Sequence, residues 1–105
     1  MDIDHAAKCL SELGNPTRLA IFRLLVRAGA TGLTVGGIQK RLNVPASTLS
    51  HHISHLVWAG LIVQERDGRT LHCHTQPGVM DDLVGFLMDE CCKGFDADSD
   101  ASRAG

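Results

Sequence analysis

Residues 34–62, TVGGIQKRLNVPASTLSHHISHLVWAGLI, decide the fold of this chain. The first part predicts a short helix that Thr34 can cap, and residues 43–45 (NVP) form a tight turn. Beyond the turn, apolar residues recur at the i, i+4, i+7 and i+8 positions of one helix face. They are Leu49, Ile53, Leu56 and Val57. Two short helices joined by a tight turn, the second with a polar outer face, indicate a helix-turn-helix.

Two helices are predicted before this motif. Apolar residues at helical spacing predict a first helix that ends at Gly14. Asn15 can cap a second helix, and Pro16 suits its first position. Because this second helix is apolar on almost every side up to Gly29, we expect it in the middle of the core.

A hairpin and a last helix are predicted after the motif. Residues 61–66 and 69–75 alternate with a period of two around Asp67-Gly68, a dipeptide that tight hairpins prefer. Residues 77–94 are expected to form the last helix. Four helices, a small β-hairpin and a fifth helix make a mainly α fold, the winged helix-turn-helix.

One domain accounts for the 105 residues. We expect this domain at residues 1–93, followed at residues 94–105 by an acidic tail that is disordered. A domain of this size buries a limited core, so we expect a second copy to cover the apolar faces of the terminal helices. The predicted assembly is a homodimer.

The sequence shows neither a membrane span nor an export signal. No apolar run approaches the roughly 18 residues that a span needs, and residues 1–9 lack the basic stretch and apolar core of a secretory signal. We therefore expect a cytoplasmic protein with no membrane partner. The four cysteines should stay reduced there, and such cysteines bind metal, sense or pack rather than form a disulfide framework.

Charge is unevenly distributed along the chain. The net charge is −2, but residues 15–75 contain seven Lys and Arg against two Asp and Glu. The remaining segments contain ten acidic residues against three basic ones. A basic middle between acidic ends is typical of a domain that presents one face to phosphate.

Three stretches resemble the ArsR/SmtB family of dimeric bacterial metal-sensing repressors. They are NPTRLAIFRLL (15–25), STLSHHISHLVWAGLI (47–62) and ERDGRTL (65–71), and the run from Ser50 to Ile62, with His52 as its histidine, is the most specific. The resemblance covers roughly residues 5–93 and implies a winged helix that binds double-stranded operator DNA. One departure is Pro45-Ala46, where family members often begin the recognition helix with Ser-Gln.

The predicted DNA-binding residues lie on the second helix of the motif and on the wing. A helix in the major groove must present short polar side chains from its first turns, and later ones reach the DNA backbone. On this helix the candidates are Ser47, Thr48, Ser50, His51, Ser54 and His55. Arg66 and Arg69 bracket the hairpin turn, where they can hold phosphate or enter the minor groove, or can serve as solvated charges.

Histidines could also suggest a metal site. His51 and His55 have the i, i+4 spacing that can bind zinc, but the sequence offers no third ligand nearby. His72 and His74 flank Cys73, yet strand alternation directs them to the opposite face. We therefore interpret these histidines as DNA-facing or solvated residues rather than zinc ligands.

Cys91 and Cys92 are the sharper candidates for a binding site. On the predicted last helix they continue its apolar stripe, so packing is the alternative. A disulfide between neighbours is disfavoured, because disulfide geometry needs a wider Cα separation than one peptide link gives. A thiolate at a helix C-terminus meets partial negative charge, which a bound thiophilic cation would offset.

Soft thiolates select soft ions. The resemblance implies that sensors with two or three cysteines and no Asp/His set respond to arsenite or antimonite, so the expected effector is As(III) or Sb(III). The third sulfur would be Cys73, which we favour, or Cys9.

The sequence therefore predicts a repressor of a metalloid-resistance operon that leaves its operator when As(III) binds cysteine thiolates. Two alternatives stay open: the same fold sensing reactive sulfur, oxidant or an organoarsenical, or a thiol metal-carrier protein. No C-x-x-C site, Ser/His/Asp set or paired carboxylates stand out, so we expect neither an enzyme nor an organic cofactor.

Overall fold

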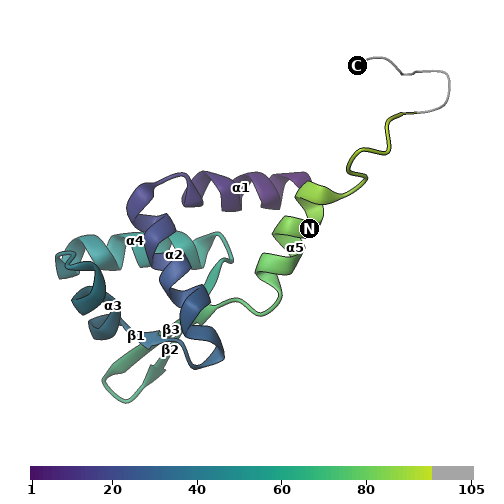
Figure 1. Ribbon diagram of the computed structural model, residues 1–105. Coiled ribbons are helices and arrows are strands. Elements are labelled where there is room, and N and C mark those ends of the chain that lie inside the picture. Colours follow the sequence, from purple (N-terminus) through teal and green to yellow (C-terminus); the bar gives the residue numbers. More distant parts are fainter. Residues whose placement is uncertain (96–105) are drawn as a thin grey trace.

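The computed structural model describes residues 1–95 and has the predicted order of elements (Figure 1). Five α-helices surround a small antiparallel sheet, which confirms the winged helix-turn-helix. Most of the expected tail, residues 96–105, lies outside the described residues. The elements are α1 (Ile3–Leu13), α2 (Pro16–Ala28), η1 (Gly29–Thr31), β1 (Leu33–Thr34), α3 (Val35–Leu42), α4 (Ala46–Trp58), β2 (Ile62–Asp67), β3 (Thr70–Thr75) and α5 (Val79–Met88).

Local capping bonds define the helix starts that the sequence predicts. Asn15 Oδ1 accepts from the backbone N–H groups of Thr17 and Arg18, at 2.9 and 3.0 Å. Thr34 Oγ1 accepts from the N–H of Gly37 at 3.0 Å, which caps α3. Asn43 adopts the left-handed conformation, with φ 54°, and so ends α3 and begins the turn into α4.

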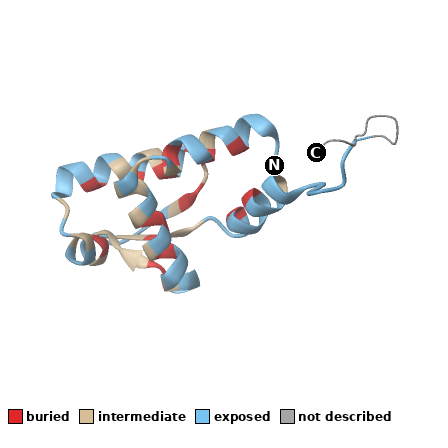
Figure 2. Ribbon diagram, turned by 45° about the horizontal axis from the view of Figure 1, so that its top comes forward, coloured by how far each residue is buried: buried red, intermediate tan, exposed pale blue. Residues whose placement is uncertain are grey.

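The core lies where α2 crosses α4 and the sheet. Its largest fully buried side chains include Phe22, Ile21 and Leu25 from α2 and Leu49, Ile53 and Leu56 from α4. Figure 2 shows the buried positions on the inward faces of these helices. Two expectations are corrected: α2 is not buried all round, since Leu19 and Val26 are exposed, and Val57 of α4 is exposed as well.

The sheet contains a third strand that the sequence did not predict. β1 pairs antiparallel with β3, Leu33 opposite Cys73, so the strand order is β1-β3-β2. Just before β1, Gly32 has φ 66°, and a Cβ built there would lie 2.1 Å from the carbonyl oxygen of Cys73. Only glycine permits this close approach. The pairing therefore ties the segment that leads into the helix-turn-helix directly to the wing.

The hairpin turn lies one residue later than predicted. Asp67 pairs with Thr70, so the two turn residues are Gly68 and Arg69 rather than Asp67 and Gly68. Gly68 has φ 64°. Glycine at the first turn position is the preference of a type II′ hairpin, whereas Asp-Gly in the turn itself suits type I′.

Helix α5 stands apart from the other helices, at the same end of the molecule as the N-terminus (Figures 1 and 2). Val79 and Leu83 pack against the core, while most of the other apolar side chains of α5 are exposed. The exposed apolar residues on the two terminal helices are Ile3, Leu10, Met80, Val84, Leu87 and Met88. None of the helices in residues 1–95 is long and apolar enough to cross a membrane.

The last helix is shorter than the sequence predicts. It ends at Met88, because Asp89 is extended (ψ 128°) and Glu90 has a left-handed φ of 58°. The Cys91 N–H donates to Met88 O at 2.9 Å, and the Lys93 N–H donates to Glu90 O at 3.2 Å, which makes consecutive turns. The expectation that Cys91 and Cys92 continue the helical stripe is therefore wrong.

Candidate nucleic-acid interface and thiol pair

The outer face of α4 is polar and open to solvent. The exposed side chains from the predicted DNA-binding set are Ser47, Thr48, Ser50, His51 and Ser54. Pro45 precedes α4 without a side-chain capping bond, so the first amide groups of the helix are left for an outside acceptor. Such a helix N-terminus attracts phosphate. The helix has the surface that a recognition helix needs, and each individual DNA contact stays a prediction.

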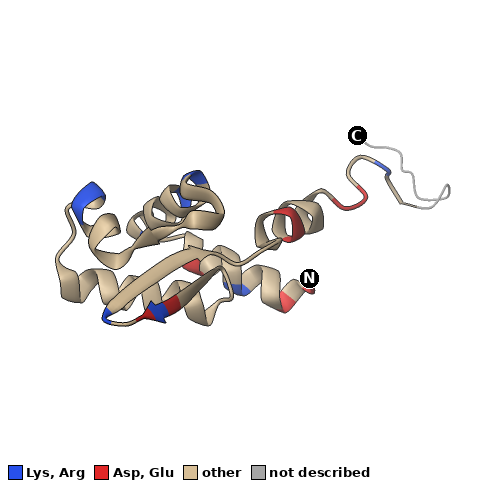
Figure 3. Cartoon of the chain, turned by 90° about the horizontal axis from the view of Figure 1, so that it is seen from below, with Lys and Arg blue, Asp and Glu red and all other residues tan. Residues whose placement is uncertain are grey.

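Two arginines stand at the tip of the wing. Arg66 lies near the end of β2 and Arg69 in the turn, and both are exposed. Neither forms an ion pair with any residue from 1 to 95. Figure 3 shows basic residues at the wing beside the two acidic residues of β2, while other acidic residues lie on α5 and near the N-terminus. The acidic ends of the sequence therefore lie away from the wing.

His74 on the second wing strand is held by two acceptors. Its Nδ1 donates to the Thr75 carbonyl at 3.0 Å, and its Nε2 donates to Glu65 Oε1 at 2.9 Å. Because neither partner can donate, both ring nitrogens need a proton in this arrangement. The bond to the Thr75 carbonyl, followed by the bond to Glu65, raises the pKa of His74 above 6.5. His74 is thus held in place, whereas the sequence predicted a solvated residue.

Replacing Glu65→Gln is expected to lower the pKa of His74 toward 6.5, because the amide removes the negative charge beside Nε2. An NMR titration of the ring protons measures this, with His72 as an internal control. Since the folded-state pKa is the higher one, the contact stabilises the fold below about pH 6.5. That contribution is lost as the pH rises through the pKa of His74. An unchanged pKa in the variant would contradict this assignment.

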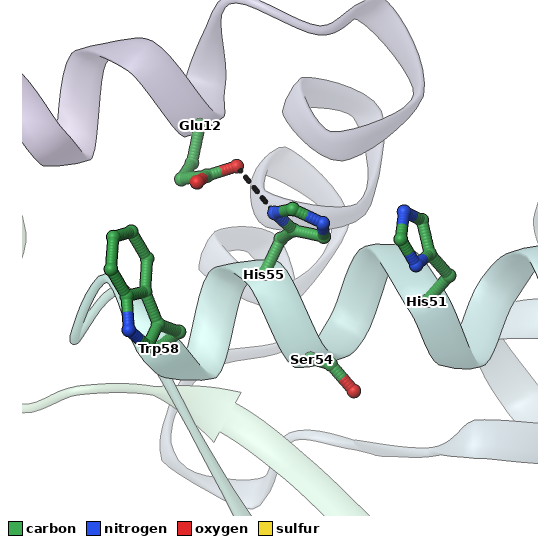
Figure 4. Close-up of a pocket in the computed structure, with 5 residues that line it drawn as sticks. All are labelled: Glu12, His51, Ser54, His55 and Trp58. Atoms are coloured by element: carbon green, nitrogen blue, oxygen red, sulfur yellow. Dashed lines mark hydrogen bonds and ion pairs between the residues drawn. The ribbon is translucent and has the colours of Figure 1, made fainter.

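A buried carboxylate joins three helices behind the recognition helix. Glu12 of α1, with a side chain only 10% exposed, accepts from His55 Nδ1 at 3.1 Å and forms an ion pair with Arg18, whose Nε lies 3.1 Å from the same carboxylate oxygen. Arg18 Nε also donates to the Glu12 carbonyl at 2.8 Å. Figure 4 shows His55 turned toward Glu12. His55, predicted to reach the DNA backbone, therefore already has one ring nitrogen bound inside the protein.

Arg18 also fixes the protonation of His52. Its Nη1 donates to His52 Nδ1 at 3.4 Å, and because a guanidinium has no acceptor, this nitrogen must be unprotonated. Burial, followed by the charges of Arg18, His51 and His55, lowers the pKa of His52 below 6.5. His52 is therefore neutral in this arrangement, and it joins α4 to α2.

Sequence reasoning missed Glu12 because an isolated glutamate on a helix is usually solvated. A signal was present, however, in its spacing. Ala6, Cys9 and Glu12 follow one another at intervals of three, and all three are buried. A charged residue in register with a buried stripe indicates a partner inside the protein.

The first half of α1 contacts the C-terminal end of α4. His5 Nε2 and Cys9 Sγ both donate to the Ala59 carbonyl, at 3.1 and 3.5 Å. Lys8 Nζ lies 3.6 Å above the ring centroid of Trp58. Burial raises the pKa of the Cys9 thiol, and the charge of Lys8 opposes this in part. Cys9 is thus buried against the end of α4.

The four thiols divide into two kinds. Cys9 and Cys73 are fully buried, and Gln64 Nε2 donates weakly to Cys73 Sγ at 3.9 Å. Burial raises the pKa of the Cys73 thiol, partly opposed by Gln64. Cys91 and Cys92 are exposed and not joined, since their sulfurs lie 3.4 Å apart, well beyond the roughly 2.05 Å of a disulfide. Only this pair is open to a ligand.

No three-residue metal site is assembled in the described part of the chain. Within residues 1–95 no group of three or more His, Cys, Asp or Glu is arranged to hold an ion. The rings of His51 and His55 lie 4.5 Å apart between centroids, but the carboxylate beside them already binds Arg18. A single chain therefore brings together two thiols, and Cys73 is not placed with them as a third ligand.

An open recognition helix followed by a wing with exposed arginines defines a winged-helix DNA-binding protein. A family model described as a helix-turn-helix domain matches residues 13–65. The chain is 31% identical over 88 residues to the nodulation protein NolR of Rhizobium meliloti, covering 84% of this chain and 70% of NolR. It is 42% identical over 60 residues to a protein of Halobacterium salinarum described as a candidate arsenical resistance operon repressor, ArsR, covering 57% of this chain and 46% of that protein.

The crystal structure of an ArsR family transcriptional regulator, RHA00566, has the same fold, with a TM-score of 0.70 at 22% identity over 86% of this chain and 90% of that one. The chain belongs to the ArsR family of winged-helix transcriptional regulators. The resemblance seen in the sequence is thereby confirmed at the level of the family. The Halobacterium protein and RHA00566 are both described as regulators of transcription.

Proposed function

We propose that this protein is a homodimeric repressor that binds operator DNA and releases it when a trivalent arsenic or antimony compound binds Cys91 and Cys92. The DNA contacts would come from the exposed face of α4 and from the wing. The proposed residues are Ser47, Thr48, Ser50, His51, Ser54, His55, Arg66 and Arg69. The exposure of most of them, the open amides at the start of α4 and two wing arginines without an ion pair in residues 1–95 support this assignment.

The exposed apolar faces of α1 and α5 support the dimer. Ile3 is 71% exposed and Leu87 57% exposed, on the first and last helices of the described residues. Pairing these faces with those of a second copy would remove both from water. Each Å² of apolar area buried in this way would stabilise the dimer by about 25 cal/mol. A symmetric dimer would then present two α4 helices to a palindromic operator.

The pair of thiols, Cys91 and Cys92, is the single observation on which the proposed effector rests. Two exposed sulfurs 3.4 Å apart, free of any disulfide, form a chelating pair for a soft ion in the reducing cytoplasm. The relative described as a candidate arsenical resistance repressor gives the chemical class. Binding at this pair, just after α5, would alter the packing of α5 and the separation of the two recognition helices. A coupling of about 1–3 kcal/mol would weaken DNA binding roughly 5- to 150-fold.

Titration of arsenite and antimonite against a fluorescent operator duplex tests the proposal. The duplex is obtained by letting the wild-type protein select from a random library. We expect the anisotropy to fall as the effector saturates the protein, whereas Zn²⁺ at the same concentration should leave it unchanged. DNA affinity that is unchanged at saturating As(III) and Sb(III) would refute the effector.

The number of thiols favours a second candidate effector. Inorganic As(III) has three exchangeable positions, but the buried Cys9 and Cys73 do not join the pair in one chain. An organoarsenical of the type R–As(OH)2 has two such positions. It condenses with two thiols to R–As(SR′)2 and two waters, with no change of oxidation state. Release by phenylarsine oxide at concentrations where arsenite has no effect would favour this candidate over arsenite.

The wing arginines give a separate prediction. Arg69→Ala is expected to weaken binding to all duplexes alike, and to reduce the slope of log K against log [salt] by about one if Arg69 neutralises one phosphate. Arg23→Ala, exposed on α2 and outside the proposed set, is the control. Anisotropy at several salt concentrations gives the slopes, and an unchanged slope for Arg69→Ala would exclude a phosphate bound by this side chain.

A further inference from the structure

A line of three side chains leads from the interior of the protein to the DNA-facing surface of α4. Glu12 binds His55 Nδ1 at 3.1 Å, and the ring of His55 meets the ring of His51 edge-on, with 4.5 Å between centroids and 70° between planes. Figure 4 shows Glu12, His55 and His51 in this order. His51 is exposed, and among residues 1–95 its ring contacts are with the neighbouring rings of His55 and His52.

The rings behind His51 have fixed orientations. Because a carboxylate only accepts, His55 must donate from Nδ1, and because a guanidinium only donates, His52 must accept at Nδ1. Glu12 and Arg18 bind each other as well, at 3.1 Å. The proton positions and ring planes on this stretch of α4 are therefore set from α1 and α2.

We propose that Glu12 is a positioning residue for the reading of DNA sequence, which holds His51 in its pose through the ring of His55. The inference rests on the proposed DNA binding by α4. A hydrogen bond to a base edge depends strongly on direction, and a side chain that is already ordered loses less rotamer freedom when it binds. Contacts to phosphate by Ser54 of α4 and by the wing need no such ordering. Loss of Glu12 should therefore reduce binding to the preferred duplex and leave general DNA affinity nearly unchanged.

A merely structural role for Glu12 makes a different prediction. Removal of the carboxylate leaves Arg18 and His55 without their acceptor, which lowers stability. An effect through stability alone would reduce binding to every duplex by the same factor. A variant that keeps the acceptor but not the charge, Glu12→Gln, separates orientation from charge, because its amide oxygen can still accept from His55.

The experiment compares affinity for the duplex selected by the wild type with affinity for a scrambled duplex of the same composition. The measurement is anisotropy, at a temperature where circular dichroism shows each variant to be folded. We expect Glu12→Ala to lose about tenfold on the selected duplex and less than about twofold on the scrambled one. His55→Ala, on a side chain 37% exposed and so tolerant of truncation, should reduce the ratio of the two affinities by the same factor, and a loss common to both duplexes would report its own contact with the DNA backbone. Glu12→Gln should keep most of the preference for the selected duplex that Glu12→Ala loses. Ser11→Ala, exposed on α1, should leave both affinities unchanged.

A double-mutant cycle completes the test. If Glu12 acts through His51, then His51→Ala should lose the same preference, and adding Glu12→Ala to it should cost nothing further. Equal losses on both duplexes, or additive losses in the cycle, would overturn the inference. A wild-type protein that selects no sequence at all would instead refute the proposed DNA binding itself.

Discussion

A protein in which Cys91 and Cys92 are both replaced by serine is expected to bind its operator as tightly as the wild type and to stay bound at saturating trivalent arsenical. The substitutions should be silent without effector, because both side chains are exposed and lie outside the helices. With effector, the wild type should lose roughly 5- to 150-fold in DNA affinity and the double variant nothing. Anisotropy on the selected duplex, with and without arsenite and phenylarsine oxide, measures both.

The single variants and the buried cysteines sharpen this prediction. Cys91→Ser and Cys92→Ser should each lose most of the response, because one thiolate cannot chelate. Cys9→Ser and Cys73→Ser should keep the response to phenylarsine oxide, and loss of the response to arsenite alone in either one would identify a third sulfur. A double serine variant that still releases DNA would contradict the proposed site. A response to persulfide but not to arsenicals would identify reactive sulfur as the signal.

Replacing Gly32→Ala is expected to give the largest loss of stability among the glycine-to-alanine substitutions in residues 1–95. Its Cβ would lie 2.1 Å from the Cys73 carbonyl oxygen and 3.0 Å from His74 Cβ, so the backbone of β1 or β3 must move. Strain at φ 66°, ψ −161° adds to this clash. The expected decrease in the free energy of unfolding is about 3 kcal/mol or more.

The chain offers a matched control in Gly29. It has nearly the same backbone conformation, φ 73° and ψ −156°, but nothing lies within 4 Å of an added Cβ. Gly29→Ala should therefore cost only the strain, about 1–3 kcal/mol. Urea denaturation of both variants, with the slope checked for two-state behaviour, gives the difference that belongs to the clash. Equal decreases in the free energy of unfolding for the two variants would show that the contact between the added Cβ and Cys73 is relieved at no energetic cost.

Much of this fold follows from short-range signals. Asn15 and Thr34 form the caps that their types predict, and Leu49, Ile53 and Leu56 are buried as their spacing requires. The sequence did not predict β1, because a strand of two residues is too short to show an alternation of apolar and polar side chains. Its pairing also depends on Cys73, about forty positions away.

The end of α5 and the role of Glu12 could not be predicted for different reasons. The apolar spacing runs on through Cys91 and Cys92, but backbone conformation ends the helix at Met88, and a periodic pattern does not encode that. Glu12 is defined by Arg18 and His55, partners on two other helices. The exposed serines of α4 could be predicted from the local pattern alone, whereas the polar contacts between α4 and its neighbouring helices required the tertiary structure.

The pairing of β1 with β3 also limits how an effector can act. Since the wing shares one sheet with the strand that leads into α3, and Glu12 links α1 to α2 and α4, we expect these elements to move together when an effector binds. The joint that remains is residues 76–78, where Gly78 (φ 79°) links β3 to α5. In the proposed dimer, a ligand on the thiols beyond α5 would therefore act far from the two α4 helices, and a small rotation about residues 76–78 would change the distance between them.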